Sequence, residues 1–275
     1  MSKQLLFFFL IILLFFNFFL WQEIFSLNKN EICFLSVGQG DSEMISFSKK
    51  TVFLIDAGPR NGQILWQLSE KLPFFKRRID LAILSHPDID HYGGFLDVVK
   101  KYEIGVFLYN GQEPKSQFLK EIFEKMLEDF SQKGTKIVKL SLGDKIFYQN
   151  NSCQVIWPVI PFLSKRTNEN SLVLFCSLAG KKVLFTGDIG KFAEKRIYSL
   201  YRDNLQVDIL KVPHHGSKSS LEEKFFLSLK PKISIIEVGK GNPYNFPSPL
   251  VTNFLAEISN QIIRTDKRGT YCLSF

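Results

Sequence analysis

The chain has 275 residues, a length that allows one large domain or two small ones. Charged residues make up 23% and hydrophobic residues 45% of the sequence, which is ordinary for a globular protein and excludes a disordered or low-complexity chain. The net charge of +8 suits a polyanionic partner such as nucleic acid or an anionic membrane surface, but a lysine-rich soluble surface has the same balance.

The N-terminus carries an apolar run of 17 residues, Leu5 to Trp21, interrupted only by Asn17. About 20 residues usually span a bilayer, so this run is at the lower limit. No small-residue cleavage site follows it, which favours an uncleaved transmembrane helix over a signal peptide. Because Lys3 precedes the run and Glu23 is the first charge after it, we expect a cytoplasmic N-terminus. The sequence thus predicts a single-pass membrane protein, with residues 1–27 as anchor and residues 28–275 as an extracytoplasmic domain.

Beyond the anchor, short apolar runs bounded by glycine and polar turns predict about a dozen strands. They lie at Ile32–Val37, Glu43–Phe47, Thr51–Ile55, Asp80–Leu84, Lys136–Leu140, Lys145–Tyr148, Cys153–Trp157, Ser171–Leu178, Lys181–Phe185, Val207–Val212, Ile233–Val238, Ile262–Thr265 and Thr270–Leu273. Helices are expected at Gln63–Lys71, from just after Gly94 through Asp97–Tyr102, at Ser248–Ile258 and, most clearly, at Lys115–Lys133, where an apolar stripe from Phe118 to Phe130 recurs at three- and four-residue steps. Such a chain most simply forms two sheets packed face to face with helices outside.

The four cysteines, Cys33, Cys153, Cys176 and Cys272, are far apart and show no CxxC spacing. Each lies in an apolar, strand-like context, where cysteine behaves as a small buried hydrophobe. We expect them in the core and not as zinc ligands, and the sequence leaves the redox compartment open.

All four histidines fall in two short clusters. The first, His86-Pro87-Asp88-Ile89-Asp90-His91, follows the apolar run Leu81–Leu84 and combines two imidazoles with two carboxylates. The second is the adjacent pair His214 and His215. Imidazole and carboxylate together are metal ligands, so the pattern indicates a metal site. The alternative is a helix N-terminus at which Asp88 or Asp90 caps backbone N–H groups.

Four candidate residues, Asp56, His86, Asp188 and His214, each come within a few residues of the end of a predicted strand. Strand ends at one edge of a sheet sandwich converge, and rigid strands position loop residues well. Taken singly, the aspartates could equally cap turns and the histidine pair could be an ordinary loop. Six potential ligands fit a pair of divalent cations better than one ion. These ligands are His86, Asp88, Asp90, His91, Asp188 and His215.

The order of these motifs resembles the metallo-β-lactamase superfamily, and within it the C-terminal domain of the ComEC family of competence DNA-uptake proteins. The matching strings are VGQGDS at Val37–Ser42, LIDAG at Leu54–Gly58, SHPDIDHYGG at Ser85–Gly94, NENSLVL at Asn168–Leu174, LFTGDI at Leu184–Ile189, LKVPHHGSKSS at Leu210–Ser220 and RTD at Arg264–Asp266. The resemblance runs from about Glu31 to the C-terminus. It implies an α/β, four-layer αββα sandwich, preceded here by the one transmembrane helix.

The resemblance also implies two metal sites that share one carboxylate. The ligands would be His86 and Asp88 for the first ion, Asp90, His91 and His215 for the second, and Asp188 as the bridge. His214 would face the substrate, although the sequence leaves open which of the two adjacent histidines is the ligand. Oxygen ligands at the first site favour Mn²⁺ or Mg²⁺ over Zn²⁺. That preference concerns the first site only. For the pair as a whole, the expected cofactor is two divalent metal ions, Mn²⁺ or Zn²⁺, with Mg²⁺ as a further candidate.

Other roles follow from the same resemblance. Asp90, Asp188 and His214 would be catalytic, and Asp56 matches a carboxylate that orients the histidine loop. Asn168 or Asn170 lies where other members of the fold place a further histidine ligand. The residues expected to support the ligands or to contact substrate are Asp41, Asp56, Asn168, Asn170, Ser217 and Lys218. Lys211 and Lys218 are expected to help hold a phosphate backbone.

Two positions depart from the family pattern. Ser36 stands where aspartate is usual, and Phe246 stands where a Tyr-Gly-His-Pro string has histidine. The many membrane spans of the channel are also missing, because the chain has only one hydrophobic span, so it cannot conduct DNA across a membrane alone.

The resemblance therefore predicts a membrane-anchored, metal-dependent hydrolase, a phosphodiesterase or nuclease whose substrate is DNA, expected to be single-stranded. Two alternatives stay open. The same site could cleave a small ester, a β-lactam or a small phosphodiester. Because fold does not fix function, the domain could also be a non-catalytic partner that docks on a separate polytopic channel subunit.

Overall fold

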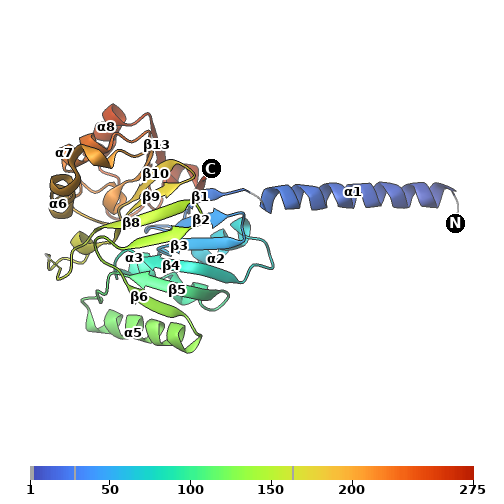
Figure 1. Ribbon diagram of the computed structural model, residues 1–275, viewed down its shortest axis with the longest axis horizontal. Coiled ribbons are helices and arrows are strands. Elements are labelled where there is room, and N and C mark those ends of the chain that lie inside the picture. The colour runs from blue at the N-terminus through green and yellow to red at the C-terminus, as the bar shows by residue number, and fades with distance from the viewer. Residues whose placement is uncertain (1–2, 28, 163) are drawn as a thin grey trace.

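The computed structural model describes the backbone of residues 3–27, 29–162 and 164–275, and their side chains except at residues 20, 22–27 and 203. Residues 1–2 of the predicted anchor, and residue 28 at the predicted domain boundary, lie outside the described residues. Figure 1 shows a layered body from which one long N-terminal helix leads away.

The body is built on two seven-stranded sheets. The first, in the order β14-β1-β2-β3-β4-β5-β6, consists of β1 (Glu31–Phe34), β2 (Glu43–Phe47), β3 (Thr51–Ile55), β4 (Arg78–Leu84), β5 (Glu103–Tyr109), β6 (Lys136–Lys139) and β14 (Tyr271–Ser274). The second, in the order β13-β12-β11-β10-β9-β8-β7, consists of β7 (Lys145–Tyr148), β8 (Asn151–Trp157), β9 (Val173–Leu178), β10 (Lys181–Phe185), β11 (Ile209–Lys211), β12 (Ile233–Ile236) and β13 (Gln261–Arg264). Strands β3 to β6 are parallel to one another, and so are β10 to β13.

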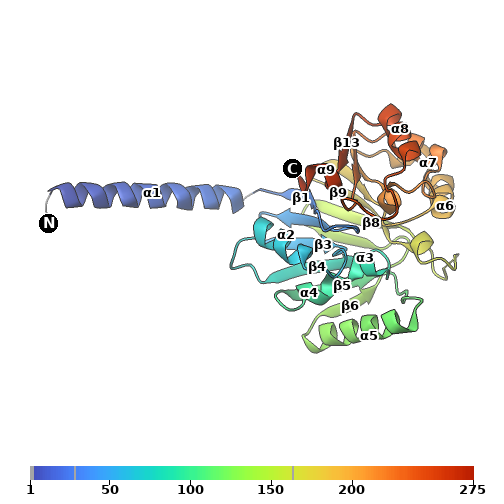
Figure 2. The ribbon, with the colours of Figure 1, turned by 180° about the vertical axis from the view of Figure 1, so that it is seen from behind.

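Helices cover the outer face of each sheet, as Figures 1 and 2 show from opposite sides. The first sheet packs against α2 (Gln63–Lys71), α3 (Ile89–Tyr92), α4 (Phe95–Val98) and α5 (Gln117–Gln132). The second packs against α6 (Lys191–Tyr201), α7 (Glu223–Leu229) and α8 (Pro249–Ile258). Three 3₁₀ turns, η1 (Asn168–Asn170), η2 (Arg202–Leu205) and η3 (Pro213–Gly216), and the short helix α9 (Thr265–Arg268) lie in the connections. The predicted αββα sandwich is confirmed.

The period-2 alternation of each strand divides the apolar side chains among three layers. In β1, Ile32 and Phe34 point between the sheets and Cys33 points toward the helices of the first sheet. Phe34 stacks on Phe185 of the second sheet with ring centroids 6.1 Å apart. Because both faces of each sheet are covered, the central strands read as continuous apolar runs.

Most predicted elements are present, with some differences. The bounds of β2, β3, β7, β10 and α2 match the prediction. The pattern does not predict β5, α6 or α7: Gly105 interrupts the apolar run of β5, α7 is only seven residues long, and charged residues interrupt the apolar positions of α6. In α5 the residues Phe123, Met126 and Phe130 are buried as the stripe predicts, whereas Phe118, in the first turn, is exposed.

Cys33, Cys153 and Cys176 are buried in the core as expected, but the four cysteines form two disulfides, which the sequence analysis does not predict. Cys33 of β1 is bonded to Cys272 of β14, and Cys153 of β8 to Cys176 of β9. In both pairs the residues face each other in the strand register. The first pair is 239 residues apart in the chain, so the sequence gives no sign of the pairing before the sheet order is known.

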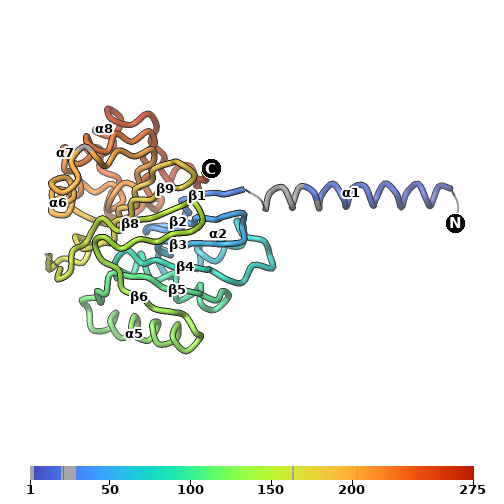
Figure 3. The backbone as a smooth tube through the Cα atoms, in the orientation of Figure 1, coloured from blue at the N-terminus to red at the C-terminus, as the bar shows by residue number. Residues whose placement is uncertain are grey.

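Helix α1 (Lys3–Leu27) stands clear of the sandwich, as the backbone trace in Figure 3 shows. Its large apolar side chains between Leu5 and Phe19, where described, are exposed. Within the residues that the structure describes, no helix is both long enough and apolar enough to cross a membrane, so the predicted transmembrane span has no support there.

Candidate metal centre

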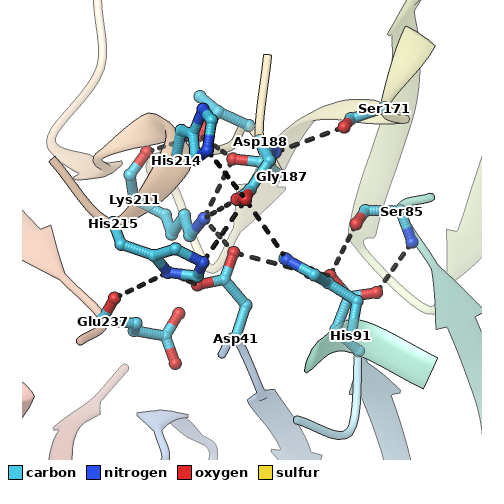
Figure 4. A network of polar contacts seen from close by, with 12 residues as sticks. Asp41, Ser85, His91, Ser171, Gly187, Asp188, Lys211, His214, His215 and Glu237 are labelled. Atoms are coloured by element: carbon cyan, nitrogen blue, oxygen red, sulfur yellow. Dashed lines mark hydrogen bonds and ion pairs between the residues drawn. The ribbon is translucent and has the colours of Figure 1, made fainter. Parts of the chain in front are cut away.

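The predicted functional residues gather at one edge of the sandwich. Asp56 follows β3, His86 follows β4, Asp188 follows β10 and His214 follows β11. All four strands run parallel to a neighbour, and ligand sites in such sheets form beyond the carboxyl ends of the strands. The two histidine clusters, 123 residues apart in the chain between His91 and His214, therefore meet (Figure 4).

The backbone is strained where these side chains are presented. Asp56, His214 and His215 have φ values of 51°, 52° and 53°, in the left-handed region that non-glycine residues rarely adopt. Gly187, next to Asp188, has φ 52°, and a Cβ there would lie 2.8 Å from Cβ of Ser171. Each strained non-glycine residue costs about 1–3 kcal/mol, so the surrounding contacts must hold these loops in place.

Asp56 is the residue that fixes the first histidine cluster. Its Oδ1 accepts a hydrogen bond from the backbone N–H of Ser85 at 2.7 Å. Its Oδ2 accepts from Ser85 Oγ at 2.6 Å and from His91 Nδ1 at 2.8 Å. The carboxylate therefore orients the His91 ring and leaves Nε2 pointing into the site.

The other two imidazoles are held in the same way. His86 Nδ1 lies 3.0 Å from Ser85 Oγ, whose proton goes to Asp56, and His215 Nδ1 lies 2.9 Å from the carbonyl oxygen of Glu237. In each ring Nδ1 is the donor, which leaves Nε2 for a ligand. The Nε2 atoms of His86, His91 and His215 are buried, and none has a hydrogen-bond partner among the described residues.

Four residues converge into one candidate metal site. Each of Asp90, His91, Asp188 and His215 offers a ligand atom, and these four atoms lie within 4.8 Å of one another. Asp188 Oδ2 is 3.4 Å from His91 Nε2 and 3.3 Å from His215 Nε2, and Asp90 Oδ2 is 3.5 Å from His215 Nε2. Two unpaired imidazole nitrogens and two carboxylates suit a divalent transition metal.

The residues predicted for the first ion are less completely assembled. His86 Nε2 lies 3.6 Å from Asp88 Oδ2, and the His86 ring packs on His91 with centroids 4.1 Å apart. Asn170 Nδ2 donates to the carbonyl oxygens of Ser164 and Arg166, and its buried Oδ1 has no hydrogen-bond partner among the described residues. No hydrogen bond among those residues joins Asn168 or Asn170 to His86.

A second carboxylate–imidazole group, Asp41, Asp56 and His91, is less suited to a metal. The His91 atom on that side is Nδ1, which already donates to Asp56. Asp41 is occupied as well, because its Oδ2 pairs with the ammonium of Lys211 and its Oδ1 lies 3.2 Å from His215 Nδ1. Asp41 and Asp56 therefore hold the histidine rings in place and are less suited to bind a metal themselves.

Lys211 does not lie where the sequence suggested. It was expected to hold a phosphate backbone, but its side chain is fully buried. Its Nζ pairs with Asp41, donates to the carbonyl oxygen of Gly187 at 2.9 Å and lies 3.6 Å from Asp188 Oδ1. Burial alone would lower the pKa of Lys211, but Asp41 and Asp188 raise it, so the ammonium stays charged. The Lys211 ammonium thus lies beside Oδ1 of Asp188, whereas Oδ2 of Asp188 faces the imidazoles of His91 and His215.

The charges of the four-residue set depend on one another. Burial would lower the pKa values of His91 and His215, but Asp188 and neighbouring carboxylates raise both well above the ordinary 6.5. Burial would raise the pKa of Asp188, but the two imidazoles hold it well below its ordinary range. Without a metal, protons therefore occupy the inward nitrogens at neutral pH, and a cation must displace them to bind.

Beneath the set lies a pair of buried carboxyl groups that the sequence analysis does not single out, Glu43 and Glu237. Burial, with the Asp41 carboxylate, raises the pKa of Glu43 to about 8, and burial and Glu43 together raise the pKa of Glu237. The strand pattern could have indicated that Glu43 and Glu237 are buried. Glu43 shares a strand face with Ile45, and Glu237 with Ile235, and those isoleucines point between the sheets.

A cavity of about 200 Å³ opens beside the set. It is lined by Lys115, Arg166, Asn168, Glu169, Asp188, Gly190, His214 and Ser219. The His214 side chain is 27% exposed, and its Nε2 is 3.9 Å from Asp188 Oδ2. Burial lowers the pKa of His214, so this imidazole is neutral at neutral pH. The geometry thus favours His215 as ligand and His214 as the residue that faces substrate.

The other predicted residues, Ser217 and Lys218, lie outside the four-residue set. Ser217 Oγ is 2.8 Å from Ser219 Oγ, and Lys218 is exposed on the same loop. Phe246, where the family pattern has histidine, packs on the rings of His214 and His215 with centroids 5.8 and 6.4 Å away. A phenyl ring neither binds a metal nor donates a proton, so this position supplies an apolar wall.

The four layers and the imidazole–carboxylate set at one sheet edge define a metallo-hydrolase fold. The family model of the metallo-beta-lactamase superfamily matches residues 35–149, which include the first histidine cluster. The metallo-beta-lactamase fold protein YhfI from Bacillus subtilis superposes with a TM-score of 0.57 at 9% identity, covering 90% of this chain and 100% of that one. The chain is therefore similar to the metallo-β-lactamase superfamily, in sequence over residues 35–149 and in fold over most of its length.

Within that superfamily the chain is similar to competence proteins, which confirms the resemblance to the ComEC family. It is 31% identical over 259 residues to ComE operon protein 3 of Bacillus subtilis (strain 168), covering 88% of this chain and 33% of that protein. It is 27% identical over 195 residues to Competence protein ComA of Neisseria gonorrhoeae, covering 70% of this chain and 25% of that protein. The chain thus spans between a quarter and a third of the length of the curated relatives it matches.

The donor set predicts which substitutions remove metal. Purified wild-type chain should retain divalent metal, and His91→Ala or Asp188→Ala should each lower metal affinity at least about tenfold, because each removes a ligand. His86→Ala tests the second ion, since it should reduce the metal content from two ions toward one. Elemental analysis after dialysis measures both. Asp80→Asn is the matched control, because its carboxylate pairs with Lys76 and Arg78 near the start of β4; equal loss there would contradict the assignment.

The metal-free protein should become less stable as pH rises. Because the folded pKa values of His91 and His215 lie above 6.5, their contribution to stability is fully present below pH 6.5 and is lost as pH rises through the raised values. Glu43, raised from 4.5 to about 8, acts in the same direction between those values. Thermal unfolding in chelator should show Tm falling above pH 6.5 by about 2–4 °C per kcal/mol lost. Added Mn²⁺ should stabilise more at high pH. A metal-free Tm that rises with pH would contradict these charges.

Proposed function

We propose that this domain is a metal-dependent phosphodiesterase that acts on DNA, with single strands as the preferred substrate. The observation that carries the proposal is the set of three imidazoles whose Nδ1 atoms are all engaged and whose Nε2 atoms are buried and unpaired beside Asp188. Such an arrangement suits metal ligation, because three inward imidazole nitrogens and a carboxylate converge without any other hydrogen-bond partner for those nitrogens among the described residues.

The proposed cofactor is a pair of divalent ions, Mn²⁺ or Zn²⁺, with Mg²⁺ as a further candidate. Asp90, His91, Asp188 and His215 would hold one ion, and His86 and Asp88 would contribute to the other. Bound cations of this kind activate water and stabilise charge on phosphoryl oxygens. Lys211 and Asp56 position the ligands, because they restrain Asp188 and His91 respectively.

The cavity beside the set supports a phosphodiester as substrate. Lys115 and Arg166 line it, and both are exposed, so they can neutralise a backbone phosphate. His214, neutral and facing the cavity, can accept a proton or form a hydrogen bond to the substrate. The role in DNA uptake rests on the names of the similar proteins, ComE operon protein 3 and Competence protein ComA. A separate polytopic channel subunit as partner stays a prediction.

We place the domain outside the cytoplasm, attached to a membrane through α1. The exposed apolar side chains of α1 and the two disulfides support this, since disulfides persist in oxidising compartments. The full chain should float with liposomes whereas residues 30–275 should not, and all four cysteines should resist alkylation in intact cells until they are reduced. Free thiols in cells, or equal flotation of both forms, would contradict the assignment.

The full chain in detergent should cleave labelled single-stranded DNA when Mn²⁺ is added. Asp90→Ala should lower kcat/KM at least about 100-fold, because a metal ligand is lost. Arg166→Ala should raise KM and reduce the slope of log KM against log salt by about one, the value for one phosphate contact. Gel analysis of the products measures both effects.

Lys125→Ala is the matched control for Arg166. It removes the same charge from the exposed face of α5, where Lys125 pairs only weakly with Asp129 at 3.9 Å. Its salt slope should equal that of the wild type. Loaded wild-type protein that cuts no DNA, or an Asp90→Ala variant that cuts as well as the wild type, would refute the proposal.

A further inference from the structure

The loop between β12 and α8 presents an aromatic pair, one ring exposed and one partly buried, beside the candidate metal centre. Tyr244 is 62% exposed, and its ring stacks on Phe246 with centroids 5.5 Å apart and an interplanar angle of 22°. Phe246 in turn packs edge-to-face on His214, with centroids 5.8 Å apart. Two ring contacts therefore lead from solvent to the imidazole that lines the cavity. We call the Tyr244–Phe246 pair the aromatic ledge.

The loop that carries the ledge is held in place by Asn242. Its Oδ1 accepts hydrogen bonds from the backbone N–H groups of Tyr244 and Phe246 at 3.2 and 3.0 Å. Its Nδ2 donates to the carbonyl oxygens of Gly239 and Phe246 at 3.1 and 2.8 Å. An aromatic surface that is ordered before a ligand arrives binds at a lower entropic cost.

The ledge is also tied to the histidine loop. The backbone N–H of Ser248 donates to the carbonyl oxygen of Gly216 at 2.9 Å, and a Cβ at Gly216 would lie 2.5 Å from Cβ of Pro247. Movement of the ledge relative to His214 and His215 would break these contacts. The distance between ledge and cavity is therefore set by the fold.

We propose that the aromatic ledge stacks an unpaired nucleobase of a strand whose phosphate lies in the cavity lined by Lys115, Arg166 and His214. This deepens the proposed function and rests on it. Every base has an aromatic face, so stacking on Tyr244 tolerates any sequence, whereas a paired base in a duplex has no free face to offer. Lys218, on the histidine loop, and Lys240, on the loop that carries the ledge, are both exposed and can attract the backbone of the same strand.

Phe246 by itself has a simpler role as the apolar wall over His214 and His215. Tyr244 does not share that role, because it touches Phe246 from the solvent side and is mostly exposed. If the ledge were only packing, removal of Tyr244 would not distinguish a strand with bases from a strand without them. This difference makes the proposal testable.

The test measures equilibrium binding to the full chain in detergent and chelator, with labelled oligothymidylate, an abasic strand of equal length and a blunt duplex. Wild-type protein should bind oligothymidylate more tightly than the abasic strand. Tyr244→Ala should weaken oligothymidylate binding about 5- to 150-fold, the range for stacking one base, and leave the abasic strand and the duplex unchanged. Tyr244→Trp should retain the preference. Phe74→Ala, at a ring that is 84% exposed after α2, should change nothing.

The proposal is overturned if wild-type protein binds oligothymidylate and the abasic strand equally, if it binds no strand, or if Tyr244→Ala weakens both strands alike. Cleavage is scored separately with Mn²⁺. A protein that prefers bases but cuts nothing would refute the proposed hydrolase and leave the ledge standing. Cleavage without any preference for bases would refute the ledge and leave the proposed hydrolase standing.

Discussion

The site depends on a positive charge buried among carboxylates. The Lys211 ammonium, fully enclosed, contacts Asp41 and Asp188 and donates to the backbone of Gly187. A buried charge without partners costs several kcal/mol, and so would the two carboxylates without the ammonium. Because Asp41 precedes β2 of one sheet whereas Lys211 ends β11 of the other, the ion pair joins both sheets at the edge where the ligands meet. Two carboxylates can thus stay ionised in an apolar layer.

A second constraint is the common orientation of the imidazoles. Asp56, Ser85 and the Glu237 carbonyl each engage an Nδ1 atom, so three rings from two distant loops present the same nitrogen inward. The strained backbone at Asp56, His214 and His215 serves the same orientation, because a relaxed turn would point these side chains away from the site. The fold therefore accepts local strain and unpaired nitrogens at one edge, and the three apolar layers supply the stability that offsets them.

Much of this could be predicted from the sequence, because strand ends and the family resemblance point to Asp56, His86, Asp90, His91 and Asp188 without coordinates, although they leave open which of His214 and His215 is the ligand. Other parts could not. The disulfides depend on which strands become neighbours, and β1 and β14 stand at opposite ends of the body in sequence. Arg166 lies in a loop without a pattern, and Lys115, predicted as the first residue of a helix, precedes α5, which begins at Gln117. Lys211 is predicted as a surface cation, but it is buried. It shares a strand face with Ile209, which points between the sheets. At the end of the strand, that face lies against the candidate metal site.

The Cys33–Cys272 bond has a consequence for the connectivity of the domain. It joins the first strand to the last, so the body between them is covalently a ring, with the N-terminal helix attached as a tail. A ring has no free end from which to unravel, and a single break in any loop, including the loops that carry the histidines, opens it into a chain without releasing a fragment. A protease cut in the loops that carry the histidines is therefore less damaging than the same cut in a linear domain.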